Sequence, residues 1–208
     1  MGTDTYRTIS SIAEGYYTEK RSRFLSFAIP VRTVEEAKAC VQAYRKKYFD
    51  ARHVCWAYML GADRETYRAN DDGEPSSTAG KPILGQINSN ELTDILIIVV
   101  RYFGGIELGT SGLIRAYRTT AAEAIATSQI EERTVDETLT IMFEYPYLND
   151  IMRIIKEEQP EIITQSFDIT CCMTLRIRKT GMERLKNRIQ KVETALIDAV
   201  IPAKAGIP

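Results

Sequence analysis

The sequence of 208 residues contains a single histidine, His53, and four cysteines, none of them spaced as C-x-x-C. A metal centre built on several histidines is therefore excluded, and so are a zinc ribbon and a thioredoxin-type redox site. The cysteines are expected to be reduced thiols that pack as small hydrophobic side chains. The chain also lacks an excess charge, because 27 basic residues stand against 28 acidic ones. Nucleic acid or anionic lipid would then need a local patch.

Long apolar runs and a leader segment are missing as well. The run Ile95–Val100 spans six residues, far short of the roughly 20 that a helix needs to cross a bilayer. Residues 1–16 show no basic segment followed by an apolar one, which is the order in a secretory signal. The composition, 44% apolar and 26% charged, is that of a folded protein. We expect a cytoplasmic protein without a membrane partner.

The first part of the chain shows strand and helix signals in turn. Thr33, with Glu36 three residues later, forms a capping box before apolar residues at helical spacing. The run 94–103 is typical of a strand buried on both faces. Residues 70–82 are almost all turn-forming and are expected to form a loop. The other elements expected here are strands at 24–29 and 54–60, a helix at 33–48, and a helix that Thr110 or Ser111 caps and that ends near residue 128.

A second pattern starts after a charged stretch at residues 131–135. It predicts strands at 139–143, 162–167, 169–178 and 195–201, and helices at 148–158 and 182–192. Helices on one face of such a four-stranded sheet give the split βαβ, or ferredoxin-like, arrangement. The sequence therefore predicts an α+β protein with domains at 1–133 and 134–202, followed by a disordered tail at 203–208.

Residues 71–81 are a first candidate site, with three carboxylates, three hydroxyls, two glycines and a lysine. Such a set can hold a divalent cation or wrap a phosphate. It is not a Walker A loop, because Pro75 replaces the first glycine and Pro82 replaces the hydroxyl residue. The alternative is a rigid surface turn in which Asp and Ser side chains cap their own backbone. The residues alone leave both interpretations open.

Residues 101–117 are a second candidate site, in which a buried strand leads through a glycine-rich bend into a helix. The first turn of a helix has free N–H groups that attract an anion. Arg101 precedes the bend and Arg115 lies one turn into the helix, and both suit phosphate or carboxylate. The spacing G-x-x-x-G-x-x-G is not the dinucleotide fingerprint. The alternative is that close packing of strand and helix requires these glycines.

Two weaker signals remain. His53 and Cys55 lie two residues apart in an expected strand, so they share a face and could form a catalytic pair, although a lone histidine at a strand edge more often has a structural role. Residues 176–191 contain seven basic residues and one acid. Such polarity indicates either a nucleic-acid interface or a solvated helix face.

Four segments together resemble the YigZ/Impact family. They are D-D-G-E-P-S-S-T-A-G-K-P (Asp71–Pro82), V-V-R-Y-F-G-G-I-E-L-G-T-S-G-L-I-R-A-Y (Val99–Tyr117), K-R-S-R-F (Lys20–Phe24) and A-R-H-V-C-W-A-Y (Ala51–Tyr58). The sequence departs from the family at Ser77 and Ser111, where glycine is expected, and at Arg52 and Val54, which flank the matching His53.

The resemblance implies a left-handed βαβ fold for the N-terminal domain, as in the second domain of ribosomal protein S-five. It implies a ferredoxin-like domain after it, and the same two folds occur in tandem as domains IV and V of elongation factor G. Eukaryotic Impact proteins restrain the amino-acid-starvation kinase by competing for its ribosome-associated activator, so the resemblance also implies a role in translation regulation and stress response.

Three functional hypotheses follow. The first is a non-enzymatic protein without a cofactor that binds RNA, the ribosome or a ribosome-associated protein. The alternative is an enzyme acting on a phosphorylated small molecule or nucleotide. In that enzyme Mg²⁺ would be held by Asp71, Asp72 and Glu74, and phosphate by Lys81, Arg101 and Arg115. The third is a protein-binding adaptor that uses the sheet or an edge of the second domain.

The two long segments are expected to build one pocket, because the loop is longer than most and a helix start attracts an anion. Arg115→Ala is expected to weaken ligand or RNA binding without unfolding the chain. The predicted anion- or ligand-binding residues are His53, Asp71, Asp72, Glu74, Ser76, Thr78, Lys81, Arg101, Gly104, Gly105, Gly109, Thr110, Ser111 and Arg115. The predicted nucleic-acid-binding residues are Arg176, Arg178, Arg184, Arg188 and Lys191.

Overall fold

The computed structural model describes residues 4–202 and has a mixed α+β architecture. Contacts divide the chain into an N-terminal unit, Tyr6–Arg133, and a C-terminal unit made of residues 4–5 and 134–202. The tail 203–208, for which the sequence predicts disorder, lies outside the described residues. Among the described residues, no helix is long and apolar enough to cross a membrane.

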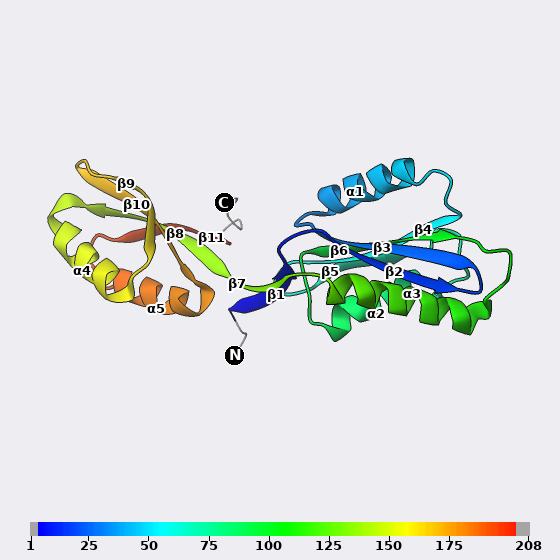
Figure 1. Cartoon of the computed structure of the whole chain (residues 1–208). Helices are drawn as coiled ribbons and strands as arrows, with labels where there is room; N and C mark the ends of the chain where they lie inside the picture. The colour runs from blue at the N-terminus through cyan, green and yellow to red at the C-terminus, as the bar shows by residue number, and fades with distance from the viewer. Residues whose placement is uncertain (1–3, 203–208) are drawn as a thin grey trace. The chain divides into compact units, whose positions relative to one another are not determined.

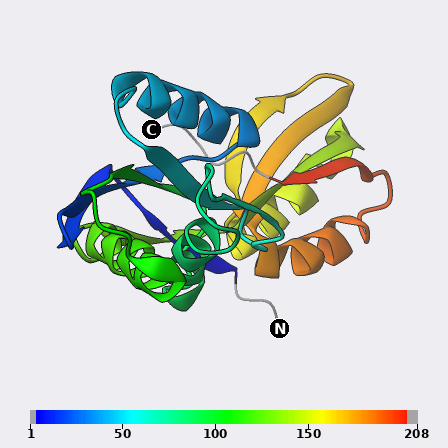
Figure 2. The ribbon, with the colours of Figure 1, turned by 90° about the vertical axis from the view of Figure 1, so that its right-hand side faces the viewer.

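The N-terminal unit is built on a five-stranded sheet. Its elements are β2 (Ala13–Glu19), β3 (Ser22–Pro30), α1 (Val34–Lys47), β4 (His53–Leu60), β5 (Thr66–Asn70), α2 (Gly80–Ser89), β6 (Ile95–Tyr102) and α3 (Gly109–Ala126). The strand order is β2-β3-β6-β4-β5, and every neighbouring pair is antiparallel. Helix α1 covers one face, and α2 and α3 cover the other (Figures 1 and 2). Strands β1 (Thr5–Ile9) and β7 (Ile130–Thr134) pair in a separate sheet.

Strand β6 lies at the centre of this sheet and is buried on both faces, as its apolar run predicts. All six side chains of Ile95–Val100 are 0% exposed. Alternate residues pack into two separate cores, one against α2 and α3 and the other against α1. Each fully buried side chain of this size contributes about 1.5–3 kcal/mol. The strand therefore fixes firmly the position of Arg101, which follows this run near the strand's end.

Thr33 caps the start of α1 as predicted, and Glu36 reaches back to the residue before the cap. Thr33 Oγ1 accepts a hydrogen bond from the N–H of Glu36 at 3.1 Å, and Glu36 accepts one from the N–H of Arg32 at 2.7 Å. These side chains satisfy donors that a helix start leaves free. The helix ends at Lys47, one residue before the predicted end.

The predicted loop at 70–82 is wrong at both ends. Asn70 is the last residue of β5, and Gly80 begins helix α2. Pro82 is tolerated there because the first turn of a helix needs no N–H donor. The turn-forming composition of the segment hid this helix, although the loop between residues 71 and 79 is present.

The C-terminal unit follows the predicted β-α-β-β-α-β order. Its elements are β8 (Asp136–Glu144), a 3₁₀ turn (Tyr145–Tyr147), α4 (Leu148–Glu158), β9 (Glu161–Ser166), β10 (Thr170–Arg178), α5 (Lys179–Ile189) and β11 (Leu196–Pro202). The strand order is β11-β8-β10-β9, and α4 and α5 pack against a core on one face of this sheet. Helix α5 ends before Lys191, which the sequence placed inside it.

Candidate functional site

A cleft of about 560 Å³ lies in the N-terminal unit. The loop 71–79 contributes Glu74 and Pro75 to its wall, and Arg52 and His53 line it from the start of β4. The other lining residues are Arg101, Phe103, Glu107, Leu108, Gly109, Thr110 and Leu113. The two sequence segments that are predicted to share a pocket thus line the same cleft.

Glu74 is the buried acid of this cleft, with a side chain that is 3% exposed. Its Oε1 accepts hydrogen bonds from Nη1 of Arg101 at 2.5 Å and from the hydroxyl of Tyr117 at 2.8 Å. Its Oε2 lies 3.8 Å from Nε2 of His53. Because its Oε1 already accepts two hydrogen bonds from buried protein groups, Glu74 organises the wall of the cleft.

Arg101 is buried beside two aromatic rings, and its Cζ lies 5.6 Å from the ring centroids of Phe24 and Phe103. One guanidinium nitrogen binds Glu74, whereas Nε has no hydrogen-bond partner within the described residues. Removing a guanidinium from water costs several kcal/mol unless an acid compensates it. Glu74 supplies that compensation, and Arg101 remains a fixed, incompletely bonded cation in the cleft wall.

Asp71 caps helix α2 from outside the helix. Its carboxylate accepts hydrogen bonds from the backbone N–H groups of Ser77 at 2.9 Å, Ala79 at 3.0 Å and Gly80 at 2.8 Å. A helix start leaves such donors unsatisfied, and the helix dipole favours a negative charge there. For Asp71, the capping interpretation of the loop therefore describes the structure.

Asp72 binds strand β4. Its Oδ2 accepts a hydrogen bond from the N–H of Val54 at 2.6 Å, and its Oδ1 pairs with an arginine of α1. Its carbonyl oxygen lies 2.7 Å from Nδ1 of His53, which fixes the imidazole against the loop. Asp71, Asp72 and Glu74 thus have separate partners, and no metal-binding group of three His, Cys, Asp or Glu side chains occurs among the described residues. The structure does not bring these acids together around a Mg²⁺ ion.

The first turn of α3 opens into the cleft without a side-chain cap. Its N-cap residue, Leu108, makes no side-chain hydrogen bond, and the turn contains no acid. Thr110 and Ser111 lie inside the helix, so neither is its cap. Both side chains are exposed, and only Thr110 lines the cleft. Gly109 has a φ of +68°, so the entry into the helix favours glycine. The amide groups of this turn are available to an anion.

The neighbouring glycines have structural roles. A Cβ on Gly104 would lie 2.1 Å from the carbonyl carbon of Arg21, because the bend packs directly on the β2–β3 turn. Gly105 has a φ of +83° with open space around it. The packing interpretation therefore describes Gly104. Of the two serines at positions where glycine is expected, Ser77 has a φ of +64°, whereas Ser111 lies in α3.

Four other predicted residues lie outside the cleft lining. Arg115 is exposed on α3 and pairs with Glu19 of β2, so the expectation that it lines the pocket is wrong. Ser76 is exposed, and Thr78 is buried and donates a hydrogen bond to the carbonyl of Pro75 at 2.6 Å. Lys81 lines a separate groove.

Cys55 is a buried thiol beneath the loop. Its Sγ lies 3.0 Å from the carbonyl oxygen of Asp71 and 3.3 Å from the hydroxyl of Tyr117. Burial raises the pKa of the Cys55 thiol far above its usual range, and it also raises the pKa of the Tyr117 hydroxyl. A neutral buried thiol is not a nucleophile, so His53 and Cys55 are not a catalytic pair.

The sequence did not single out every residue of the cleft. Tyr117, which is buried behind the cleft wall and donates to Glu74, was missed, although it follows Thr110 by about two helical turns, a spacing that indicates a shared helix face. Phe103 and Glu107 were missed too, and they carry no signal beyond their place in the glycine-rich segment.

Most of the predicted basic residues of the C-terminal unit are paired with acids. Arg184 Nε binds Glu158 at 2.5 Å, and Arg188 Nη1 binds the same carboxylate at 2.7 Å. Arg176 pairs with Glu161 at 3.2 Å. Acids of α4 and β9 therefore neutralise three of the five residues that the sequence predicts to bind nucleic acid. The other two predicted basic residues, Arg178 and Lys191, make no ion pair within the described residues.

Residues 20–125 match the model of the Impact N-terminal domain, and this range contains both segments that line the cleft. The chain is 36% identical over 155 residues to IMPACT family member YvyE of Bacillus subtilis, covering 74% of this chain and 71% of that protein. It is 37% identical over 150 residues to IMPACT family member YigZ of Escherichia coli, covering 71% and 74%. The crystal structure of a hypothetical protein is similar with a TM-score of 0.70 and 27% identity, over 98% of this chain and 100% of the other. On this similarity of sequence and fold, the chain belongs to the Impact family.

Proposed function

We propose that this chain is a non-enzymatic protein linked to translation, which binds RNA, alone or on the ribosome, through the cleft at the start of α3. The observation that carries the proposal is the uncapped first turn of α3, which opens into the cleft. Two arginines line the same cleft: Arg101, whose charge Glu74 compensates, and Arg52, which is exposed and makes no ion pair within the described residues. An RNA phosphate suits free amide groups next to positive charge.

Family membership supports the link to translation. Eukaryotic Impact proteins act on a ribosome-associated activator, and the bacterial relatives share the domain that contains the cleft. The strand order of the C-terminal sheet agrees with a ferredoxin-like domain, and a left-handed βαβ domain before it would complete the pair found in elongation factor G. Fold analogy does not identify a site, so the test addresses the cleft itself.

A charge introduced at Thr110 tests whether the cleft binds an RNA phosphate. This residue is exposed in the first turn of α3, where an acid is favoured by the helix dipole, so Thr110→Glu should leave the fold intact. The same carboxylate would repel a phosphate. We expect Thr110→Glu to weaken binding of fluorescein-labelled single-stranded RNA about tenfold at low salt, measured by fluorescence anisotropy.

Two variants serve as controls. Thr110→Gln has a similar shape without the charge and should bind RNA like the wild type. Glu107 is the exposed acid of the cleft, and Glu107→Gln should tighten binding because it removes a negative charge from the phosphate site. Co-sedimentation of the wild type with ribosomes at low salt provides the second assay. The proposal fails if the wild type binds neither RNA nor ribosomes, or if Thr110→Glu binds RNA as tightly as Thr110→Gln does.

A further inference from the structure

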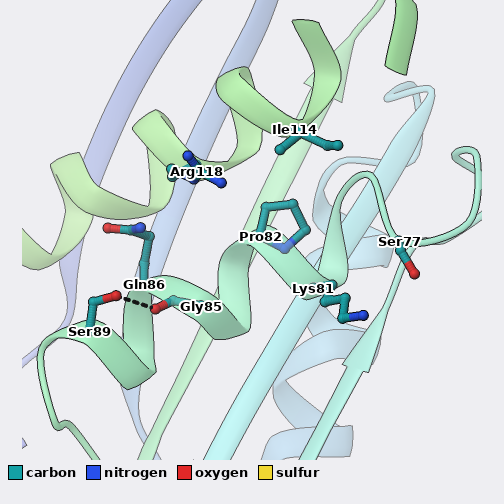
Figure 3. A pocket seen from close by; sticks show the side chains of 8 residues that line it. All are labelled: Ser77, Lys81, Pro82, Gly85, Gln86, Ser89, Ile114 and Arg118. Atoms are coloured by element: carbon teal, nitrogen blue, oxygen red, sulfur yellow. Dashed lines mark hydrogen bonds between the residues drawn. The ribbon is translucent and has the colours of Figure 1, made fainter. Parts of the chain in front are cut away.

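A second depression of about 430 Å³ lies in the N-terminal unit between α2 and α3. We call it the α2–α3 groove, and its lining residues are Ser77, Lys81, Pro82, Gly85, Gln86, Ser89, Ile114 and Arg118. Figure 3 shows Arg118 projecting from α3 and Lys81 from α2, with the ring of Pro82 between them in this view. No acidic residue lines the groove.

The two cations of the groove are uncompensated. Lys81 and Arg118 are exposed, and within the described residues neither side chain forms an ion pair or a hydrogen bond. Other arginines of the same unit do have acidic partners, namely Arg45, Arg101, Arg115 and Arg133. Two unpaired cations in a depression without acids create a local positive potential that attracts an anion.

The position of Lys81 is unfavourable for the fold. It is the second residue of α2, where the helix dipole disfavours a cation by about 0.3–1 kcal/mol. Ser77, on the same wall, has a φ of +64°, a conformation that is costly for a residue with a side chain. Local features that cost stability without a visible structural gain are expected at functional sites.

The groove and the cleft share two structural elements. Helix α3 lines the cleft with Thr110 and Leu113, and it lines the groove with Ile114 and Arg118. The loop 71–79 contributes to both depressions as well, with Glu74 and Pro75 on one and Ser77 on the other. From Thr110 to Arg118 the helix rises about 12 Å. A single phosphate cannot span this distance, whereas an RNA backbone with successive phosphates can.

We propose that the α2–α3 groove is a second phosphate subsite, in which Lys81 and Arg118 bind the backbone of an RNA strand that continues from the start of α3. This inference rests on the proposed function, because it assigns a direction and a minimum length to the same ligand. It predicts that the protein prefers an RNA strand long enough to reach both depressions over a mononucleotide.

The test combines variants with RNA length. Lys81→Gln/Arg118→Gln should weaken binding of a labelled single strand of about 12 nucleotides roughly tenfold at low salt. The slope of log affinity against log salt should become shallower by about 1.4, since each phosphate contact on single-stranded RNA contributes about 0.7. A dinucleotide reaches only the start of α3, so its affinity should be unchanged in the double variant and reduced by Thr110→Glu.

Arg115 supplies a matched control. It is exposed on the same helix three residues before Arg118, but Glu19 already neutralises it. Arg115→Gln should therefore leave the salt slope nearly unchanged. If Lys81→Gln/Arg118→Gln keeps the wild-type affinity and slope while Thr110→Glu loses affinity, the groove is not a subsite and the proposed function stands. Equal loss in Arg115→Gln and Arg118→Gln also overturns the subsite, because net charge alone would then explain the effect. If the wild type binds neither RNA nor ribosomes, both proposals are overturned; if it binds ribosomes but neither labelled RNA, only the subsite is overturned.

Discussion

Glu74→Gln tests whether the buried ion pair organises the cleft. The substitution keeps the shape of the side chain and removes its charge, which leaves the Arg101 guanidinium uncompensated. The side chains of Glu74 and Arg101 are 3% and 7% exposed, so water cannot replace the lost partner. Breaking a buried ion pair on one side costs about 3–5 kcal/mol. Because the new amide oxygen can still accept hydrogen bonds from Arg101 and Tyr117, we expect a loss of about 3 kcal/mol.

Urea unfolding followed by tryptophan fluorescence measures this loss directly. Trp56 is the only tryptophan of the chain and lies on β4, paired with Ile98 of the strand that also carries Arg101. Its signal therefore reports the N-terminal unit. For a unit of this size, about 3 kcal/mol also corresponds to a fall in melting temperature of roughly 10 °C.

Two further variants separate a buried pair from an exposed one. Arg115→Gln breaks the pair with Glu19, but Arg115 is 65% exposed, so the loss of stability should be much smaller than in Glu74→Gln. Glu74→Leu/Arg101→Met replaces the buried pair with apolar groups and should regain most of the stability that Glu74→Gln loses. A loss in Glu74→Gln no larger than in Arg115→Gln would refute the assignment of Glu74 and Arg101 as a compensating buried pair.

Two other predictions concern acids with structural roles. Asp71→Ala leaves the backbone N–H groups of Ala79 and Gly80 at the start of α2, and that of Ser77 in the loop, without an acceptor, and should cost about 2 kcal/mol in the same urea assay. Asp71→Asn should cost less because it retains an acceptor oxygen, and equal stability of all three proteins would contradict the cap. Burial raises the pKa of the Asp94 carboxyl, so the folded state favours the protonated acid. The stability contributed by this group is then full below the ordinary carboxyl pKa near 4 and declines as the pH rises toward the raised folded value. As the pH rises across that interval, the wild type should lose stability relative to Asp94→Asn. A difference in unfolding free energy between the two proteins that does not depend on pH would contradict the raised pKa.

The sequence predicts the elements whose signals are local. Strand β6 was found because its apolar run is continuous, and α1 because Thr33 and Glu36 have the spacing of a capping box. Helix α2 was missed because it begins with the turn-forming sequence G-K-P. Its capping residue, Asp71, lies nine residues before the first residue of the helix. Strand β2 was missed because its sequence, A-E-G-Y-Y-T-E, is largely polar and shows no apolar alternation.

The candidate site shows the same limit. Both segments that line the cleft were identified from their composition, since glycines and clustered polar residues have few roles in a regular core. The partner of each charged side chain was not predictable, because ion pairs form between strands and helices far apart in the sequence. Arg115 pairs with Glu19 across 96 positions, and Arg101 pairs with Glu74 across 27. Composition thus located the site but could not show which charges remain free.

The acids of the loop, which from composition alone could hold a cation, serve the fold. Asp71 binds the start of α2, Asp72 binds β4, and Glu74 binds Arg101. A carboxylate that already accepts hydrogen bonds from protein groups would leave those donors unsatisfied if it turned to a metal ion, at about 1–3 kcal/mol for each buried donor. By contrast, within the described residues Arg52 and the first turn of α3 in the cleft, and Lys81 and Arg118 in the α2–α3 groove, have no acidic partner. The distribution of satisfied and unsatisfied charge therefore favours an anionic ligand over a metal-dependent reaction at this loop.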